Sequence, residues 1–131
     1  MGEVVTDSGI EHWLYPINPK SKQWGYESSS FEVLSDNGLH TWDINKGKTT
    51  SLNLGDQLWI YESRPVSAIV GKGTVVSTPE FDGERIIFEI KFDVALAKRL
   101  KNAPLKGMLS GPAPQSPRRL RPDELTRLRK Q

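Results

Sequence analysis

The chain has 131 residues, which suits one domain with its own hydrophobic core and no disulfide or structural metal. It contains no cysteine and only two histidines, His12 and His40. This composition excludes disulfides and cysteine zinc sites and argues against a histidine metal centre. No apolar run approaches the roughly 20 residues of a membrane helix, and the polar, acidic start is unlike a signal peptide. We therefore expect a soluble, cytoplasmic protein with no membrane contact and no cofactor.

The charge is distributed unevenly along the chain, although the net charge is only +2. Residues 1–97 carry 8 Lys/Arg and 14 Asp/Glu, a balance of −6. Residues 98–131 carry 10 Lys/Arg and 2 Asp/Glu, a balance of +8. A basic segment on an acidic body is a candidate surface for nucleic-acid phosphates, and a solvated basic tail is the alternative.

The chain begins with a polar stretch, residues 1–10, that we expect to be a disordered lead before a single domain over residues 11–131. Residues 12–17 are rich in aromatic side chains, which predicts a strand with Pro16 near its end or at a sheet edge.

A short helix is predicted near residues 28–35, because serines there can cap it and two apolar residues follow at i, i+3 spacing. The Asp-Asn-Gly sequence that follows is typical of a helix end. Residues 39–55 are mostly polar and predict a long loop around Trp42.

Three strands are predicted next, at residues 57–63, 67–77 and 84–92, with a turn between the last two. Gly71 and Gly73 lie inside the second of them, where glycine indicates a bulge or a close backbone approach. The third strand alternates cleanly, and its apolar face consists of Ile86, Phe88, Ile90 and Phe92.

The C-terminal part predicts two helices separated by a proline-rich loop. Asp93 can cap the first helix, near residues 93–101, and residues 103–117 hold four prolines. The second helix, near residues 122–130, has Pro122 and acids in its first turn and basic residues at its end. Strands in sequence with short helices between them predict an α+β domain with a curved, mostly antiparallel sheet or barrel.

No enzyme signature is present: the sequence lacks a nucleophile elbow, a phosphate-binding loop and a paired-histidine metal motif. We therefore expect a protein that is not an enzyme. A small enzyme that acts on a nucleotide or RNA remains an alternative, because the carboxylate of Asp43 lies next to Trp42 in the sequence. The four tryptophans are the unusual feature, since Trp24 and Trp42 lie in polar segments. Each either plugs the core or stacks on a planar ligand, and stacking on a nucleic-acid base is worth roughly 1–3 kcal/mol.

Four stretches of the sequence carry a shared pattern: His12-Trp13-Leu14-Tyr15 with Asn18-Pro19, Trp42-Asp43-Ile44-Asn45, Gly55 to Ser63 with Ile69 to Val75, and Arg119-Leu120 with Pro122 and Glu124-Leu125. In this order they resemble the EVE domain, a PUA-like family related to the YTH readers of methylated adenine in RNA. The third stretch is the most specific, because it resembles a strand pair of that family with a Gly-Asp start and Tyr-x-Ser and Gly-x-Gly patterns.

The resemblance implies a PUA-like barrel of five or six strands flanked by short helices, with an aromatic pocket for one modified base. Trp42 would be the first wall of that pocket, and Phe92, in place of the tryptophan usual in YTH readers, the second. Asn18 would read the edge of the base and Asn45 would complete the edge contacts. Tyr61, as an alternative wall, and Ser63 join them in the predicted ligand-binding set.

We therefore predict a non-enzymatic nucleic-acid-binding module that recognises a modified base, such as a methylated cytosine or adenine, in DNA or RNA. Its backbone contacts are assigned to Arg118, Arg119 and Arg121. A protein partner in a defence or RNA-processing system would accompany the nucleic acid. The alternative is a protein-interaction or regulatory domain that retains the barrel without base binding and presents an exposed apolar patch instead.

Overall fold

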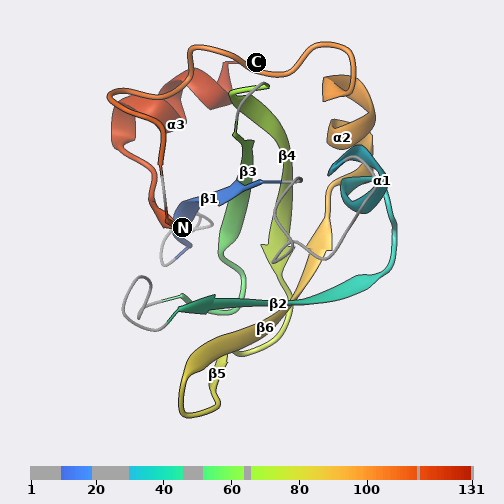
Figure 1. The fold of residues 1–131 in the computed structure, drawn as a ribbon, viewed down its shortest axis with the longest axis vertical. Helices are drawn as coiled ribbons and strands as arrows, with labels where there is room; N and C mark the ends of the chain where they lie inside the picture. The colour runs from blue at the N-terminus through green and yellow to red at the C-terminus, as the bar shows by residue number, and fades with distance from the viewer. Residues whose placement is uncertain (1–9, 19–29, 46–51, 64–65, 115, 131) are drawn as a thin grey trace, which may run out of the picture.

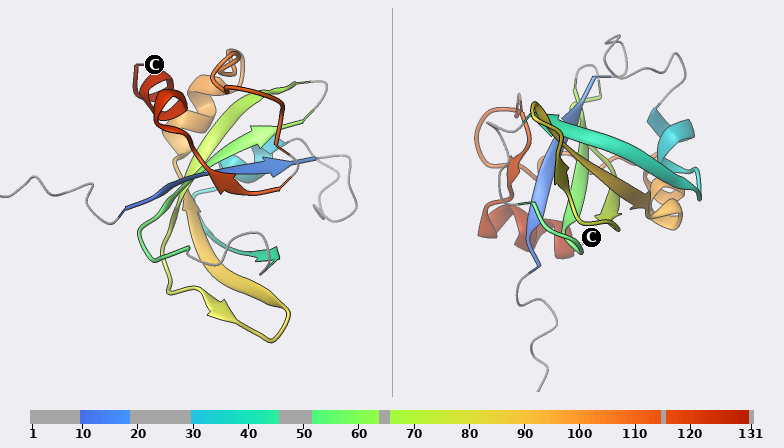
Figure 2. Two further views of the ribbon diagram at one scale, coloured as in Figure 1. Left: turned by 90° about the vertical axis from the view of Figure 1, so that its left-hand side faces the viewer. Right: turned by 90° about the horizontal axis from the view of Figure 1, so that it is seen from below.

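The protein is a strongly curled, seven-stranded sheet with short helices gathered at one end and a β-hairpin extending from the other (Figures 1 and 2). The strands are β1 (His12–Ile17), β2 (Leu39–Asn45), β3 (Gln57–Glu62), β4 (Ala68–Val75), β5 (Glu80–Phe81), β6 (Arg85–Phe92) and β7 (Arg118–Arg119). The helices are α1 (Ser30–Leu34), α2 (Val94–Leu100) and α3 (Pro122–Arg129). This computed structural model describes residues 10–18, 30–45, 52–63, 66–114 and 116–130.

The strands follow the order β2-β6-β4-β3-β1-β7, and β5 pairs with β6. Every pairing is antiparallel except that of β1 with β3, which is parallel. The predicted α+β fold with a curved sheet and flanking short helices is thereby confirmed, as a half-barrel with a mixed sheet. The predicted lead lies almost wholly outside the described residues, so the domain limits stay a prediction. None of the helices in the described ranges is long and apolar enough to span a membrane.

The prediction of a loop over residues 39–55 is wrong in its first part, because β2 forms there and pairs with β6 along its whole length. Trp42 and Ile44 are buried on one side of β2, whereas Thr41 and Asp43 are exposed on the other. Only two of these residues are apolar, so the period of two is too short to recognise without the partner strand. Within the predicted turn before β6, two residues form β5.

The sheet is covered on both faces, by two separate clusters of buried side chains. Neighbouring residues of β3 go to opposite clusters, since Leu58 and Ile60 join one and Trp59 and Tyr61 the other. We call the cluster inside the curl the inner core; it consists of Trp13, Ile17, Val33, Leu34, Trp42, Ile44, Leu52, Leu58, Ile60, Val75, Phe88, Ile90, Phe92 and Ala97. The outer core consists of Leu14, Trp59, Tyr61, Ile69, Leu100 and Leu128.

The two glycines of β4 lie at the two features that the sequence suggested, an irregularity in strand pairing and a close backbone approach. The register of β3 against β4 shifts between Ile60 and Tyr61, next to the pairing of Ile60 with Gly71. At Gly73 the backbone of β4 runs so close to β6 that an added Cβ would lie 2.6 Å from Cδ1 of Ile90 and 3.0 Å from Cδ1 of Phe92. Both of those side chains are buried in the inner core and have little room to move.

Substituting Gly73 with alanine is therefore expected to lower the free energy of unfolding by about 1–3 kcal/mol, the usual cost of overpacking a core. Urea unfolding followed by tryptophan fluorescence measures it. Gly38→Ala is the matched control, because its Cβ would meet only the carboxylate of Asp36, at 3.4 Å. A Gly73→Ala protein as stable as the Gly38→Ala protein would contradict the close approach.

The basic C-terminal segment is docked on the sheet and does not trail away as a tail. β7 pairs with β1, which places Arg119 opposite Trp13 and Arg118 opposite Leu14. α3 follows at once and buries Leu128 in the outer core. The resulting position brings positive charge next to the edge of the half-barrel formed by β1.

Candidate functional site

A continuous row of four rings crosses the inside of the half-barrel from β1 to β2. Tyr15 and Trp42 lie 4.8 Å apart between ring centroids, Trp42 and Phe92 5.2 Å, and Phe92 and His40 5.1 Å. Three strands separate β1 from β2 in the sheet order, so only the curl of the sheet brings these rings together. We call Tyr15, Trp42, Phe92 and His40 the aromatic row.

The aromatic row is joined across the barrel by a hydrogen bond, since the hydroxyl of Tyr15 donates to the backbone carbonyl oxygen of Asp43 at 2.9 Å. Burial and the nearby carboxylate of Asp43 raise the pKa of Tyr15 to about 12, against a smaller lowering by Arg85. The hydroxyl is thus a donor throughout the neutral range. Asp43 itself pairs with Arg85 at 2.9 Å on the surface, and both side chains are largely exposed.

Trp42 and Phe92, the two predicted pocket walls, both belong to the aromatic row, but their rings contact each other. Trp42 is 8% exposed and meets Phe92 nearly edge to face, with 61° between the ring planes. Two walls that sandwich a base must be parallel and separated by its thickness, so these rings do not form an open slot in this arrangement. Trp42 belongs to the inner core. Core packing was the alternative to ligand stacking for a tryptophan in a polar segment.

The remaining predicted ligand residues do not form one group. Asn18 is exposed directly after β1, and the backbone N–H of Ser63 donates to the carbonyl oxygen of Ile17 at 3.0 Å, so Asn18 and Ser63 lie at the same end of the sheet. Asn45 is the last residue of β2, and its side chain is not described. Trp24, the other tryptophan in a polar segment, lies outside the described residues. Tyr61 does not face Trp42, because it belongs to the outer core.

The three arginines predicted to contact the nucleic-acid backbone form interactions within the protein. Arg118 forms two hydrogen bonds with Glu124, at 2.9 and 2.8 Å, and is therefore a structural residue. Arg119 pairs with Glu11 at 3.3 Å and lies over the ring of Trp13, and Arg121 donates to the carbonyl oxygen of Ser110. Arg119 and Arg121 keep about half of their side-chain surface, 53%, exposed to solvent.

A second basic group lies in the last turn of α2 and in the loop after it; it belongs to the predicted basic segment, but its residues were not among those assigned to the nucleic-acid backbone. Lys98, Arg99 and Lys106 are exposed, and none of them forms an ion pair with a carboxylate in the part of the chain that the structure describes. A signal was present in the sequence: Asp123 and Glu124 lie close to the selected arginines, whereas no acid lies within four residues of these three. We call Lys98, Arg99 and Lys106 the free basic group.

No family model matches the sequence, and no curated protein matches it. Solved structures do match. A tyrosine-to-phenylalanine variant of the ASCH protein of Zymomonas mobilis has a TM-score of 0.56 and 12% identity, over 92% of this chain and 97% of the other. The same protein without that substitution scores 0.52 at 14% identity, over 92% and 94% of the two chains. The Rpa0253 protein of Rhodopseudomonas palustris, solved by NMR, scores 0.54 at 14% identity, over 92% of each.

These matches concern the fold, since so few residues are identical. The chain shares the overall fold of these structures, which include that of an ASCH protein. Membership of the EVE family itself stays a prediction.

Proposed function

We propose that this protein is a non-enzymatic nucleic-acid-binding module that reads one modified base at the aromatic row. The observation that carries the proposal is the row itself, four rings gathered inside a PUA-like half-barrel. Aromatic side chains bind any base by stacking, and the amide of the exposed Asn18 both donates and accepts hydrogen bonds. Stacking then supplies affinity, while the amide supplies discrimination.

Because Trp42 contacts Phe92 directly, base binding requires the two rings to separate. The aromatic pair lost on separation is worth about 0.5–1.5 kcal/mol, whereas stacking a base on the indole gains about 1–3 kcal/mol. Stacking on a base can therefore offset the lost aromatic pair, and the base must in addition replace the apolar contacts that the two buried rings give up. A methyl group on the base adds about 0.8 kcal/mol when it is buried, which by itself gives only a few-fold preference.

The phosphates of the nucleic acid are assigned to exposed cations. The free basic group is available in the last turn of α2 and the loop after it, and Arg119 and Arg121 each retain about half of their side-chain surface exposed. Arg118 is left out of this surface because its guanidinium holds the buried Glu124. The resemblance of the sequence to the PUA-like EVE and YTH readers implies the same class of partner.

The base-reading part is tested by titrating oligonucleotides of one sequence that are unmodified or carry 5-methylcytosine or N6-methyladenine, as DNA and as RNA. Wild-type protein is expected to prefer one modified form. Asn18→Ala should reduce that preference while keeping most of the affinity, and the exposed Asn102→Ala serves as the control. Equal binding of all forms by the wild type would end the proposal of base reading.

The phosphate contacts are tested through the salt dependence of the same titrations. Each phosphate contact contributes about 0.7–0.9 to the slope of log affinity against log salt concentration. Replacing Lys98, Arg99 and Lys106 together with glutamine is therefore expected to reduce the slope by about 2–3 units. Lys91→Gln, an exposed lysine on β6, is the single-charge control. An unchanged slope in the triple variant would show that these three side chains do not contact the phosphates.

The alternative of a protein-interaction module is favoured by one observation, the exposed large apolar side chains Leu39, Leu54, Val76 and Phe81. Leu54 and Val76 adjoin residues that are hydrogen-bonded to each other, Gly55 and Val75. Under this alternative every oligonucleotide binds equally and weakly, and the affinity depends on charge alone.

A further inference from the structure

The β-hairpin formed by β5, a turn and the start of β6 extends away from the body of the protein (Figures 1 and 2). Its tip, residues 80–84, has the sequence Glu-Phe-Asp-Gly-Glu, and all five residues are exposed. Phe81 is 52% exposed and stands between two carboxylates, those of Glu80 and Asp82. The tip therefore presents one large aromatic side chain flanked by negative charge. We call residues 80–84 the acidic tip.

The acidic tip is held in a fixed shape by hydrogen bonds. Phe81 pairs with Ile86 across the hairpin, and the N–H of Asp82 donates to the carbonyl oxygen of Arg85 at 3.1 Å. The carboxylate of Asp82 accepts from the N–H groups of Glu84 and Arg85, at 2.9 and 2.7 Å. An aromatic side chain on a preformed turn loses little conformational freedom when it binds, so Phe81 is suited to anchor an interface.

An apolar groove lies at the other end of the molecule, where α1 and α2 pack beside β4 (Figure 1). It has a volume of about 280 Å³. An apolar cavity of about 150 Å³ is sufficient for benzene, so the ring of a phenylalanine fits in this groove. The apolar walls are Phe31, Val66, Val70, Ala97, Leu100 and Pro104.

Positive charge lies on the α2 side of the groove. Lys101 lines the groove, and its ammonium nitrogen is 4.5 Å from the ring centroid of Phe31. Lys98 is exposed one turn earlier, in the last turn of α2. Glu62, at the end of β3, also lies among the walls. A partner's carboxylates are therefore favoured on the α2 side of the groove and disfavoured on the β3 side.

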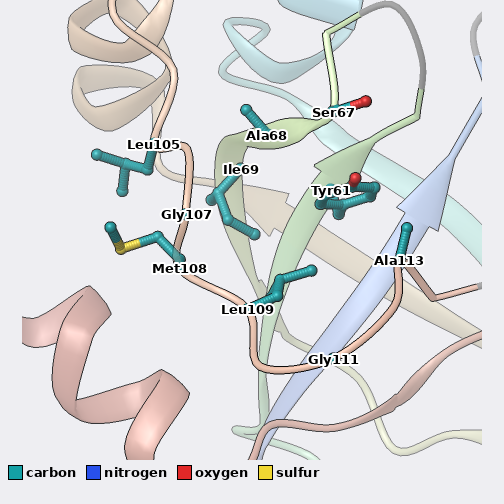
Figure 3. A pocket seen from close by; sticks show the side chains of 10 residues that line it. All are labelled: Tyr61, Ser67, Ala68, Ile69, Leu105, Gly107, Met108, Leu109, Gly111 and Ala113. Carbon is teal, nitrogen blue, oxygen red and sulfur yellow. The ribbon is translucent and has the colours of Figure 1, made fainter.

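The wall at Pro104 is fixed before any partner binds. The next residue, Leu105, exchanges two backbone hydrogen bonds with Ile69 of β4, both of 3.0 Å. Figure 3 shows the loop that carries Leu105 running beside β4. A preformed groove lowers the ordering cost of binding, as the fixed turn does for the acidic tip.

We propose that the acidic tip of one copy of this protein docks in the apolar groove of a second copy, with Phe81 in the groove and the two flanking carboxylates against Lys98 and Lys101. The same chain supplies both surfaces, and they are complementary in charge as well as in apolar character. The hairpin and the two helices lie at opposite ends of the molecule, so a chain cannot fill its own groove (Figure 1). The contact therefore joins copies head to tail.

Self-association is measured by sedimentation velocity of the wild-type protein in the absence of nucleic acid, so the result does not depend on the proposed base reading. One hairpin tip buries less than the roughly 1,200 Å² of a stable complex, so we expect a dissociation constant on the order of 10⁻⁴ M. The mean mass should rise with protein concentration, and the rise should weaken in high salt because the charge pairs are exposed. A protein that stays monomeric at about 1 mM, tenfold above that constant, would overturn the proposal.

Phe81→Ser tests the anchor, because it removes the ring and keeps all three carboxylates of the acidic tip. Self-association should become at least about tenfold weaker, as for a residue that anchors an interface. Leu54→Ser is the matched control, since Leu54 is 59% exposed but lies outside the hairpin. Both side chains are mostly exposed, so the melting temperatures should stay close to that of the wild type. Unweakened association of Phe81→Ser, or an equal loss in Leu54→Ser, would contradict docking through the acidic tip.

The head-to-tail arrangement is tested by mixing two variants that each lack one surface. The double variant Lys98→Glu with Lys101→Glu has a damaged groove and an intact acidic tip, whereas Phe81→Ser has the reverse. Each variant alone should stay monomeric, and an equimolar mixture should form dimers and nothing larger, because only one contact remains possible. Lys91→Glu with Lys130→Glu, two exposed lysines away from the groove, is the charge-matched control and should associate as the wild type does.

The position of the contact is read by NMR in the same mixture. Isotope-labelled Phe81→Ser protein is titrated with the unlabelled double variant, and the resonances of Phe31, Val70 and Leu100 should shift saturably. A mixture that stays monomeric would overturn the proposal, and so would shifts that leave these three groove residues unchanged.

Discussion

Replacing Asp56 with alanine is expected to lower the free energy of unfolding by about 3 kcal/mol or more. The carboxylate of Asp56 is fully buried and accepts three hydrogen bonds, from Nε1 of Trp13 at 2.9 Å and from the backbone N–H groups of Asn53 and Glu11 at 2.9 and 3.0 Å. It thereby fastens the start of β3 to β1. Without it the three donors lose their partner, at about 1–3 kcal/mol for each one that water does not reach.

Asp82→Ala is the matched control, because Asp82 also accepts two backbone hydrogen bonds, from Glu84 and Arg85, but on an exposed turn. Water can replace its carboxylate, so we expect a loss of less than about 1 kcal/mol. Asp56→Asn should remain strongly destabilising, since its amide nitrogen would face donors. Urea unfolding of the variants at neutral pH measures the differences. Similar losses for Asp56→Ala and Asp82→Ala would show that burial of the carboxylate contributes nothing.

Substituting Glu124 with glutamine is expected to cost about 3–5 kcal/mol, the range found when one partner of a buried ion pair is removed. The side chain of Glu124 is fully buried. Both of its oxygens bond to Arg118, and they also accept from the N–H groups of Arg121 and Ser110, at 2.8 and 2.9 Å. Glutamine keeps the size but loses the charge that the Arg118 guanidinium requires.

The effect of Glu124 depends on pH in a defined direction. Burial by itself raises the pKa of Glu124, but the hydrogen bonds from Arg118 and from the two backbone N–H groups outweigh it and lower the pKa to about 2. The ordinary value is 4.5. A carboxyl whose pKa is lowered by folding stabilises the protein fully above the unfolded value and loses that contribution as pH falls through the folded value.

Melting temperatures of wild type and Glu124→Gln should therefore differ most above pH 4.5 and converge as the pH falls toward 2. Asp123→Asn is the control, since Asp123 pairs with Arg127 at 3.1 Å on the surface and such pairs contribute about 0–1 kcal/mol. A gap between wild type and Glu124→Gln that stays constant from pH 7 to pH 2 would contradict the ion pair.

Local patterns predicted those parts of the fold whose signal lies within a few neighbouring residues. The alternation in β6 placed Ile86, Phe88, Ile90 and Phe92 on the buried face, as observed. Asp93 caps α2 by accepting from the N–H of Leu96, also as predicted. These patterns depend on spacing along one segment, and no distant partner has to be known.

The aromatic site could be predicted only in part. Aromatic residues in polar segments indicated Trp42, and Phe92 does lie beside it. Tyr15 and His40, which complete the aromatic row, were not selected, since nothing in the strand around Tyr15 or in the supposed loop around His40 indicates that the sheet curls. The assignment of Asn18, Asn45 and Ser63 to a base pocket stays a prediction.

By itself the sequence determined the class of the domain, most of its strands and helices, and the basic character of its C-terminal segment. Tertiary structure alone decided that residues 39–45 form a strand, that β1 runs parallel to β3, and which cations remain free. Arg118 and Arg99 are equally basic in the sequence, yet only Arg118 finds a buried carboxylate. The physical reason is that each of these outcomes depends on pairing between segments far apart in the chain, and local spacing carries no information about such pairing.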